Sequence, residues 1–365
     1  MDLRTHATRV AILVILSLAL GPRLVTARAQ VAAPLPMHGQ KLQIVGGLAN
    51  IHQYVRNEEP FWTQELSRLT GGKYSAEIVP FDRAGVPGEL MLQLMELGVV
   101  PFGTALLSLS SSQIPALGAL DLAGLNPDIS TLRRHLTAFR PRLQRLLREQ
   151  SSVELLAVYI YPAQVLFCKR PFADLGDLQG RRIRISSPTQ ADLVSALGAT
   201  PVLIGFSQIV ANMQSGNTEC AVTGAMSGNI IGLHEVSSHY HPLPFSWGIA
   251  IFGANREAWN ALPADLRALL RREIPRLEAN IWAESERETA EGMACNRGDA
   301  NCTTGRKGAM KEVAYTAADA RQVQDILRNT VIPRWLQRCN QACKELWDST
   351  IGAVRPATLQ RPAER

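Results

Sequence analysis

The alternation of apolar and polar residues predicts a regular succession of strands and helices. Residues 41–45 form a short apolar strand, and the amphipathic helix after it carries apolar side chains at near-helical spacing up to Leu69. Gly71 and its neighbours end that helix, as a C-terminal glycine cap does. Residues 74–80 alternate as a second strand, and residues 89–97 form a short amphipathic helix. Strand, helix, strand and helix in this order predict an α/β fold with a largely parallel sheet.

The central part of the chain predicts a second sheet. A basic amphipathic helix over residues 131–149, with its arginines facing solvent, and a strand over residues 155–161 lead into it. A later apolar strand, residues 248–252, is expected to return to the first sheet. The strands expected in the second sheet are residues 182–185, 201–204 and 218–222, with a helix over residues 207–214 before the last of them.

A helical run from Pro263 to about Glu291 is much longer than the average helix of roughly 11 residues. Its leucines and isoleucines form one apolar stripe, and Pro275 marks a place where the helix can bend. A helix of about 28 residues extends about 42 Å, which is enough to lie across two lobes. Residues 319–335 predict another helix.

Residues 1–29 have the three parts of a secretory signal peptide. A basic start precedes the apolar run Val10–Leu20, and Ala-Arg-Ala stands before the cleavage point. The run is too short to span a bilayer, and no later segment offers about 18 uninterrupted apolar residues. No Arg-Arg pair precedes the run, which favours the general secretory route. We therefore expect an exported, soluble mature protein.

Composition and charge place the chain among ordinary globular proteins. It is 46% hydrophobic and 19% charged, with a formal net charge of +6. Four of the 38 basic residues and one of the 32 acidic residues lie within residues 1–29, so the mature chain carries a net charge of +3. This small and dispersed charge gives no reason to expect a nucleic-acid partner.

Export makes disulfides the natural use of the cysteines, because they persist outside the cytosol. Cys295 and Cys302 flank a polar, glycine-containing loop, so we expect a bridge between them. Cys339 and Cys343 are four residues apart, which is an awkward spacing for a bond on a regular helix. Either the helix ends there or each of the two pairs elsewhere, and pairing between the two late clusters stays open.

The remaining cysteines, Cys168 and Cys220, lie in apolar surroundings. We interpret them as buried free thiols, although a bridge between them is not excluded. A zinc site built from the four late cysteines is less favoured than disulfides in an oxidising compartment.

Arg184 is the strongest candidate for chemistry. In the strand that contains it, side chains take opposite faces alternately, so an arginine between Ile183 and Ile185 either emerges at the strand end or meets an anion. A guanidinium suits a carboxylate because it donates two parallel hydrogen bonds and stays charged at physiological pH. The alternative is a solvated arginine at the end of a strand.

Catalytic and cofactor motifs do not stand out. The chain has no nucleophile elbow, no phosphate-binding loop and no dinucleotide fingerprint, and no paired carboxylates are identifiable, so we expect no cofactor and no enzyme. His234, His239 and His241, with Glu235, are the one candidate metal cluster. Their spacing fits neither H-E-x-x-H nor a helical pair, so a surface loop without metal is the better interpretation.

Stretches spread over most of the mature chain share one family pattern in their order and spacing. They are residues 48–72, 83–98, 177–185, 196–208, 213–220, 234–236 and 254–263. In these stretches the chain resembles the periplasmic solute receptors of tripartite ATP-independent periplasmic (TRAP) transporters, of the DctP type. The resemblance implies a two-lobed α/β fold of the Venus-flytrap kind, with lobes of residues 41–161 plus 249–288 and 162–248 plus 289–351, and a disordered tail over residues 352–365. It also implies that Arg184 holds the carboxylate of the ligand.

The chain departs from the family pattern of sialic-acid receptors at two positions. Gln164 stands where they carry a second ligand-binding arginine, and Thr223 stands where they carry an asparagine. A second carboxylate would lack a partner, and an unpaired buried charge costs several kcal/mol. We therefore expect a monocarboxylate with an apolar or aromatic body. Phe206, Trp247 and Tyr161 are candidate walls, with plain core packing as the alternative for each.

The resemblance further implies binding by closure of two lobes about hinge strands near Tyr161 and Gly248, and delivery to integral membrane TRAP permease subunits from the periplasm. The turn Ala49–His52, with Asn50 and His52, is expected to contribute from the opposite lobe, and Glu89 is a further candidate in the second matching stretch. The alternative function is an exported enzyme or ligand-sensing module on the same scaffold.

Overall fold

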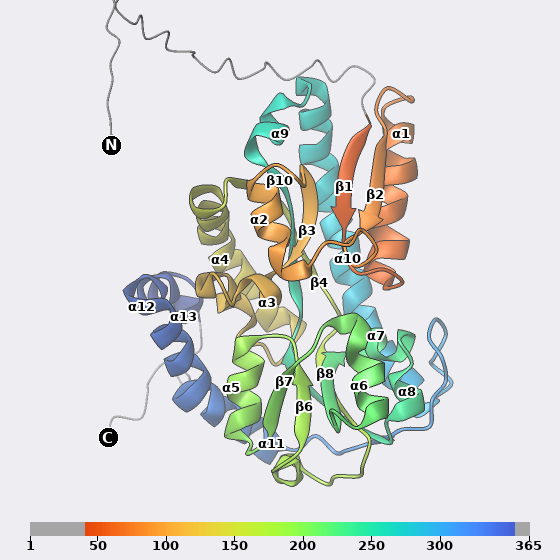
Figure 1. The fold of residues 1–365 in the computed structure, drawn as a ribbon, viewed down its shortest axis with the longest axis vertical. Helices are drawn as coiled ribbons and strands as arrows, with labels where there is room; N and C mark the ends of the chain where they lie inside the picture. The colour runs from red at the N-terminus through yellow and green to blue at the C-terminus, as the bar shows by residue number, and fades with distance from the viewer. Residues whose placement is uncertain (1–40, 355–365) are drawn as a thin grey trace, which may run out of the picture. The chain divides into compact units, whose positions relative to one another are not determined.

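The structure is a computed structural model and describes residues 41–354 (Figure 1). These residues belong to one compact unit. The predicted signal peptide, residues 1–29, and most of the predicted tail, from residue 355 on, lie outside the described residues. Two sheets and the helices packed on them make up the described chain, which confirms the predicted α/β class.

The first sheet contains five strands in the order β2-β1-β3-β10-β4. β1 pairs in parallel with β2 and β3, but β10 runs antiparallel to both of its neighbours, so the sheet is mixed rather than largely parallel. All residues of β10 are buried because the strand lies inside the sheet, and its predicted return to the first sheet is confirmed. The strands are β1 Leu42–Gly46, β2 Ala76–Pro80, β3 Phe102–Leu106, β4 Val153–Ile160 and β10 Ile249–Asn255.

The second sheet contains six strands in the order β11-β9-β5-β8-β6-β7. β6, the predicted arginine strand, pairs in parallel with β7 and β8, whereas β5 runs antiparallel to β8 and β9. The sequence pattern did not predict β9, because two prolines and two histidines interrupt its alternation. The strands are β5 Gln164–Cys168, β6 Arg182–Ile185, β7 Thr200–Leu203, β8 Cys220–Gly224, β9 His239–Ser246 and β11 Lys311–Glu312.

Helices cover both sheets, and segments labelled η contain 3₁₀ or π turns. The predicted helix after β1 is present but is built largely of π turns. It ends at Leu69, and Gly71 follows in the turn with a φ of 59°, which only glycine adopts readily. The helical segments on the side of the first sheet are η1 Gln53–Glu58, η2 Phe61–Glu65, α1 Leu66–Leu69, η3 Gly88–Leu90, α2 Met91–Glu96, α3 Leu107–Ser110, η4 Pro115–Asp121, α4 Ile129–Gln150 and α9 Arg256–Ala261. The helical segments on the side of the second sheet are η5 Leu175–Leu178, α5 Pro188–Ala196, η6 Phe206–Gln208, α6 Ile209–Ser215, α7 Ala225–Ile230 and α8 Leu233–Val236.

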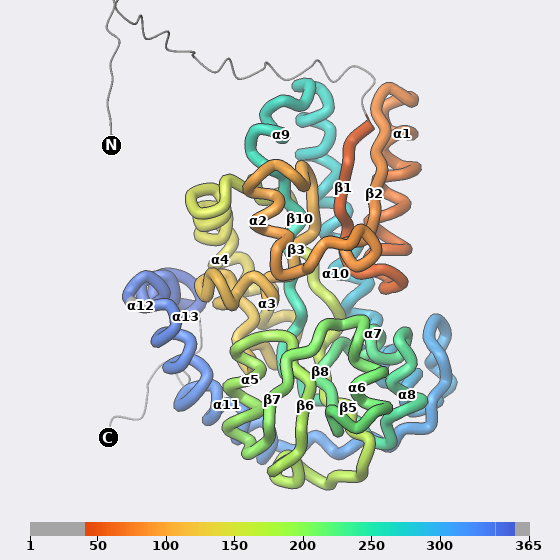
Figure 2. Tube along the Cα trace, viewed as in Figure 1, coloured from red at the N-terminus to blue at the C-terminus, as the bar shows by residue number. Residues whose placement is uncertain are grey.

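The long helix α10, Ala264–Arg297, contacts β4 of the first sheet and α7, the helix that follows β8 of the second sheet (Figure 2). On the first sheet, the indole of Trp282 donates a hydrogen bond to the carbonyl of Val158 in β4. On the second, the Asn296 amide donates to the carbonyl of Ala225 in α7. The helix has 34 residues, longer than predicted, because its polar last turns are held by contacts with α7 that sequence periodicity does not show.

The C-terminal helices pack against both parts of the chain. α11 contacts α5, and α12 contacts η4. Ile351 is buried and begins a last helical turn, so the predicted tail starts too early at residue 352. Within residues 41–354, no helix combines the length and the apolar character that crossing a membrane requires. The bounds are α11 Ala317–Ile326, η7 Leu327–Val331, α12 Ile332–Ser349 and α13 Ile351–Val354.

The six cysteines form three disulfides. Cys295 pairs with Cys302, as predicted. Cys168 pairs with Cys220, so the preferred interpretation of two free thiols is wrong. The physical reason is that the two residues are direct partners in the antiparallel ladder between β5 and β8, which places their Cβ atoms close together.

The third disulfide joins Cys339 to Cys343 within α12. We expected the helix to end there or each cysteine to pair elsewhere, and both expectations are wrong because α12 continues to Ser349. Positions four apart lie on the same face of a helix, so the two side chains point in the same direction.

The segment with His234, Glu235, His239 and His241 is not the predicted surface loop. The first two belong to α8, and the other two belong to β9. His241 is completely buried and pairs with Asp319 at 3.7 Å. Burial lowers the pKa of this imidazole, while the carboxylate raises it. Among the described residues these four do not form a metal cluster.

Candidate functional site

A cavity of about 770 Å³ lies between the two sheets. Its walls come from the loops that follow β1 and β2, from β3 and α3, and from the ends of β5, β6, β7 and β8. Polar residues line the cavity from the side of the second sheet, and both apolar and acidic side chains line it from the side of the first sheet. The lining residues used below are Phe81, Asp82, Glu89, Leu109, Tyr161, Gln164, Arg184, Phe206, Thr223, Ser227 and Gly248.

Arg184 lines the cavity from β6 and is only 4% exposed. Its Nε donates to the carbonyl of Ile204 at 2.9 Å, and its Nη1 donates to the carbonyl of Val222 at 2.7 Å. Among the described residues no carboxylate pairs with the Arg184 guanidinium, and no acceptor atom receives a hydrogen bond from its Nη2. Burial lowers its pKa to about 9. The guanidinium is therefore oriented by two carbonyls but not neutralised, and a buried cation in that state favours an anion beside it.

Gln164 lines the same cavity from the start of β5. Its carbonyl oxygen accepts from the Gln190 amide at 2.7 Å, and Gln190 also donates to Ser246 at 2.7 Å. Gly248, the residue before β10, lies so close that a Cβ there would meet the Gln164 amide nitrogen. Its φ of 60° also favours glycine, so this junction between the sheets leaves no room for a side chain.

Further polar groups line the cavity on both sides. Thr223 and Ser227 are buried on the side of the second sheet, and the Ser227 hydroxyl has no hydrogen-bond partner among the described residues. Because buried hydroxyls are rarely left unsatisfied, this one is available to a bound molecule. Asp82 and Glu89 bring two carboxylates from the first sheet's loops. Of the predicted ligand-binding residues, the cavity thus brings together Arg184, Gln164, Thr223, Phe206 and Glu89.

Three other predicted ligand-binding residues do not line this cavity. Trp247 is 3% exposed and donates its indole N–H to the carbonyl of Asn126. Asn50 accepts a hydrogen bond from Arg83, and His52 contacts Glu288 of α10.

Asp121, which the sequence analysis did not single out, holds the junction between β9 and β10. Its two carboxylate oxygens accept from the backbone N–H groups of Trp247 at 2.8 Å and Gly248 at 3.0 Å. Burial raises its pKa to about 7, although these backbone hydrogen bonds act in the opposite direction. No local pattern could have indicated this role, because it arises only when η4 approaches a strand that lies more than 120 residues further along the chain.

The raised pKa of Asp121 predicts a pH-dependent stability. The folded chain binds a proton at this site below about pH 7, whereas the unfolded chain binds it only below about pH 4. The contribution of Asp121 to the free energy of unfolding therefore falls as pH rises from about 4 to 7. We expect the melting temperature of wild type relative to Asp121→Asn to be higher at pH 5 than at pH 8. Thermal unfolding of both proteins in matched buffers measures this, and equal differences at the two pH values contradict it.

The model of the DctP family, bacterial extracellular solute-binding proteins of family 7, matches residues 49–317 of the chain. The chain belongs to this family. A curated relative, the uncharacterized protein YiiZ of Salmonella typhimurium, is 24% identical to this DctP-family chain over 203 residues. The alignment covers 51% of the chain and 61% of that relative, which is less than two thirds of its length.

Three solved structures share the fold of this family member. A receptor from Bordetella pertussis that binds pyroglutamic acid has a TM-score of 0.75 at 18% identity, covering 85% of this chain and 99% of that one. A TRAP solute-binding protein from Desulfovibrio salexigens with bound orotic acid has a TM-score of 0.74 at 14% identity, and the match covers 84% of this chain and 96% of that one. A TRAP solute-binding protein from Rhodoferax ferrireducens with bound malonate has a TM-score of 0.73 at 19% identity, and the match again covers 84% of this chain and 96% of that one. The two-lobed solute-binding fold predicted from the sequence is confirmed.

Proposed function

We propose that the chain is the periplasmic receptor of a TRAP transporter, which binds an organic acid and delivers it to permease subunits in the membrane. The observation that carries the proposal is Arg184, a buried guanidinium that lines the cavity between the sheets with no anionic partner among the described residues. Family membership and the carboxylic acids bound by the neighbouring structures support it. Binding without turnover is the expected activity.

The ligand is a monocarboxylate with an apolar or aromatic body. Arg184 is the only cationic residue among those that line the cavity in the described chain, so one carboxylate finds a partner. A second carboxylate would face Asp82 and Glu89 instead, and repulsion between like charges disfavours it. Phe81, Leu109 and Phe206 offer apolar surface to the rest of the ligand, as is usual in small-molecule sites. Pyroglutamic and orotic acids, bound by two of the neighbours, carry one carboxylate on a ring.

Ligand binding closes the two lobes. The proposed rigid bodies are residues 41–161 plus 249–288 and residues 162–248 plus 289–351, with hinge strands near Tyr161 and Gly248. A ligand held by Arg184 on one side and by the Phe81–Glu89 loop on the other contacts both bodies, and only such a ligand shifts the equilibrium toward the closed form. Asp121, which holds the backbone of Gly248, keeps the hinge in place during closure.

A thermal-shift screen tests the proposed ligand class. Pyroglutamate, orotate and other cyclic monocarboxylates are compared with malonate and with the uncharged amide of pyroglutamate. We expect one or more monocarboxylates to stabilise the protein by about 2.7 kcal/mol at a hundredfold excess over Kd, and the amide to have no effect. Chromatography of the mixture should recover the ligand unchanged. Stabilisation by malonate alone, or by the amide as strongly as by the acid, contradicts the proposal.

A further inference from the structure

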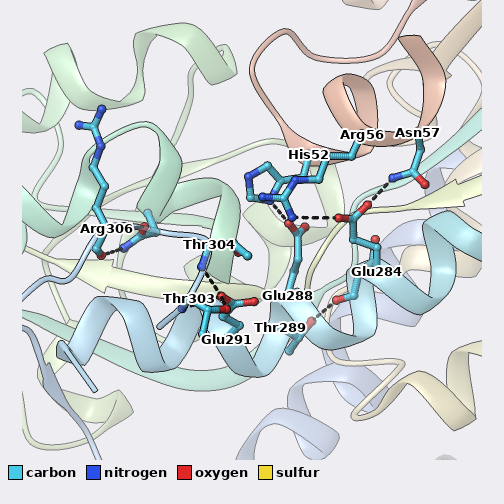
Figure 3. A network of polar contacts seen from close by, with 12 residues as sticks. His52, Arg56, Asn57, Glu284, Glu288, Thr289, Glu291, Thr303, Thr304 and Arg306 are labelled. Carbon is cyan, nitrogen blue, oxygen red and sulfur yellow. Dashed lines mark hydrogen bonds and ion pairs between the residues drawn. The ribbon is translucent and has the colours of Figure 1, made fainter. Parts of the chain in front are cut away.

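A second polar cluster lies away from the ligand cavity, between η1 and α10 (Figure 3). It consists of His52, the residue before η1, and of Glu284 and Glu288 on α10. All three residues are buried: their exposed fractions are 8%, 9% and 4%. One ligand-type atom from each lies within 4.8 Å of the others.

The two glutamates lie four residues apart, so they occupy the same face of the helix. Like charges at that spacing destabilise a helix, and burial makes the cost larger because the carboxylates lose hydration. Among the described residues, Arg56 is the only cationic side chain besides the histidine that pairs with either glutamate, at 3.3 Å from Glu284. Its side chain is 41% exposed, and an ion pair of that kind contributes at most about 1 kcal/mol.

Glu288 is the less compensated of the two. Its single partner among the described residues is the Nδ1 of His52, and its other carboxylate oxygen has none. Glu284 by contrast is held by Arg56 and by the amide of Asn57 (Figure 3). A nearly buried carboxylate with a free oxygen therefore points into a cluster that already contains a second carboxylate and an imidazole.

We propose that His52, Glu284 and Glu288 bind a divalent first-row transition cation, for which Zn²⁺ is the probe. One imidazole nitrogen and two carboxylate oxygens are ligands that Zn²⁺ accepts, with the fourth position left to water. Three such ligands at about 2.1 Å from an ion lie about 3.4 Å apart, so small side-chain rotations bring the cluster to coordinating distance. Ca²⁺ does not fit, because it requires six to eight oxygen ligands.

The bound cation would replace Arg56 as the partner of Glu284. The guanidinium is half in solvent already and can leave without being buried elsewhere. This competition separates a cation site from a network that only stabilises the fold. In a cation site Arg56 opposes binding, whereas in a structural network Arg56 is one of the supporting members.

The experiment is titration of the chelator-stripped mature chain with Zn²⁺ by isothermal calorimetry, with Co²⁺ absorption spectra as a second readout. We expect one ion per chain, binding at least about a hundredfold weaker in His52→Ala and in Glu288→Gln, since each removes one of three ligands. Glu291→Gln is the matched control. Glu291 lies less than one turn beyond Glu288 on α10, but its carboxylate accepts from Thr303 and Thr304, so its replacement should leave Zn²⁺ affinity unchanged.

Arg56→Gln is expected to act in the opposite direction from the ligand variants. It should raise the affinity for Zn²⁺ at least about fivefold over wild type, because one competing positive charge is removed. Since it removes no ligand, it decides the matter even if Glu288→Gln fails to fold. The proposal is overturned if wild type takes up no stoichiometric Zn²⁺, if the two ligand variants bind it like wild type, or if Arg56→Gln weakens binding. None of these measurements depends on the organic ligand.

Discussion

Replacing Arg184 with alanine is expected to weaken binding of the carboxylate ligand severely. The wild-type guanidinium is buried, and the carbonyls of Ile204 and Val222 fix its direction without neutralising it. An anion in the cavity therefore gains a charged hydrogen bond that is already oriented. Removing one partner of such a buried pair costs about 2–5 kcal/mol, so affinity should fall by at least about thirtyfold and up to several thousandfold.

Calorimetric titration with the best monocarboxylate from the screen measures this loss. Arg182→Ala is the matched control, because Arg182 lies on the same strand but is exposed and bonds the carbonyls of Gly216 and Asn217 outside the cavity. We expect the control to bind like wild type. Undiminished binding by Arg184→Ala would remove the basis of the proposed function, whereas equal losses in both variants would indicate damage to β6 rather than loss of the anchor.

Gly292→Ala is expected to be the most destabilising single-methyl change in α10. A Cβ at residue 292 would lie 2.5 Å from the carbonyl carbon of Ala225 and 2.7 Å from the Cα of Met226. Both atoms belong to the backbone of α7, so no side-chain rotation relieves the contact, and the two helices must separate. Overpacking costs about 1–3 kcal/mol and occasionally more, and we expect the upper end, net of the roughly 1 kcal/mol that alanine gains over glycine in a helix.

Urea unfolding monitored by circular dichroism measures the effect. Gly205→Ala is the control for stability, because a Cβ at that position meets no atom within 4 Å and the backbone there lies outside the left-handed region. Its free energy of unfolding should change by less than about 0.5 kcal/mol. A Gly292→Ala protein as stable as this control would mean that the close packing of α7 on α10 is not required.

Local pattern was sufficient for much of the fold. The isoleucines on either side of Arg184 indicated a buried strand, and β6 is that strand. The apolar stripe of the run from Pro263 to about Glu291 indicated α10, but the last turns of the helix are stabilised by Asn296 and by contacts with α7, which no periodicity reveals. β9 was not predicted because Pro242 and Pro244 interrupt its alternation of apolar and polar residues. Without β9, the segment that contains the histidines was interpreted as a loop.

Tertiary proximity explains what the sequence could not show about the sites. The gathering of Gln164, Arg184 and Thr223 at one cavity depends on the strand order β5-β8-β6, which is not the order along the chain. Whether these residues contact a ligand stays a prediction. The histidine cluster that did stand out in the sequence is not a candidate cation site, whereas His52 meets Glu288 across 236 residues.

The Cys168–Cys220 bond has a consequence for when the binding surface matures. It joins β5 to β8 a few residues from Gln164 on one strand and Thr223 on the other. Disulfides form in oxidising compartments and are rare in the cytosol. A newly synthesised chain would thus receive this covalent link only after translocation, in the same space where we propose that it meets its cargo, and a precursor still inside the cell would lack that reinforcement.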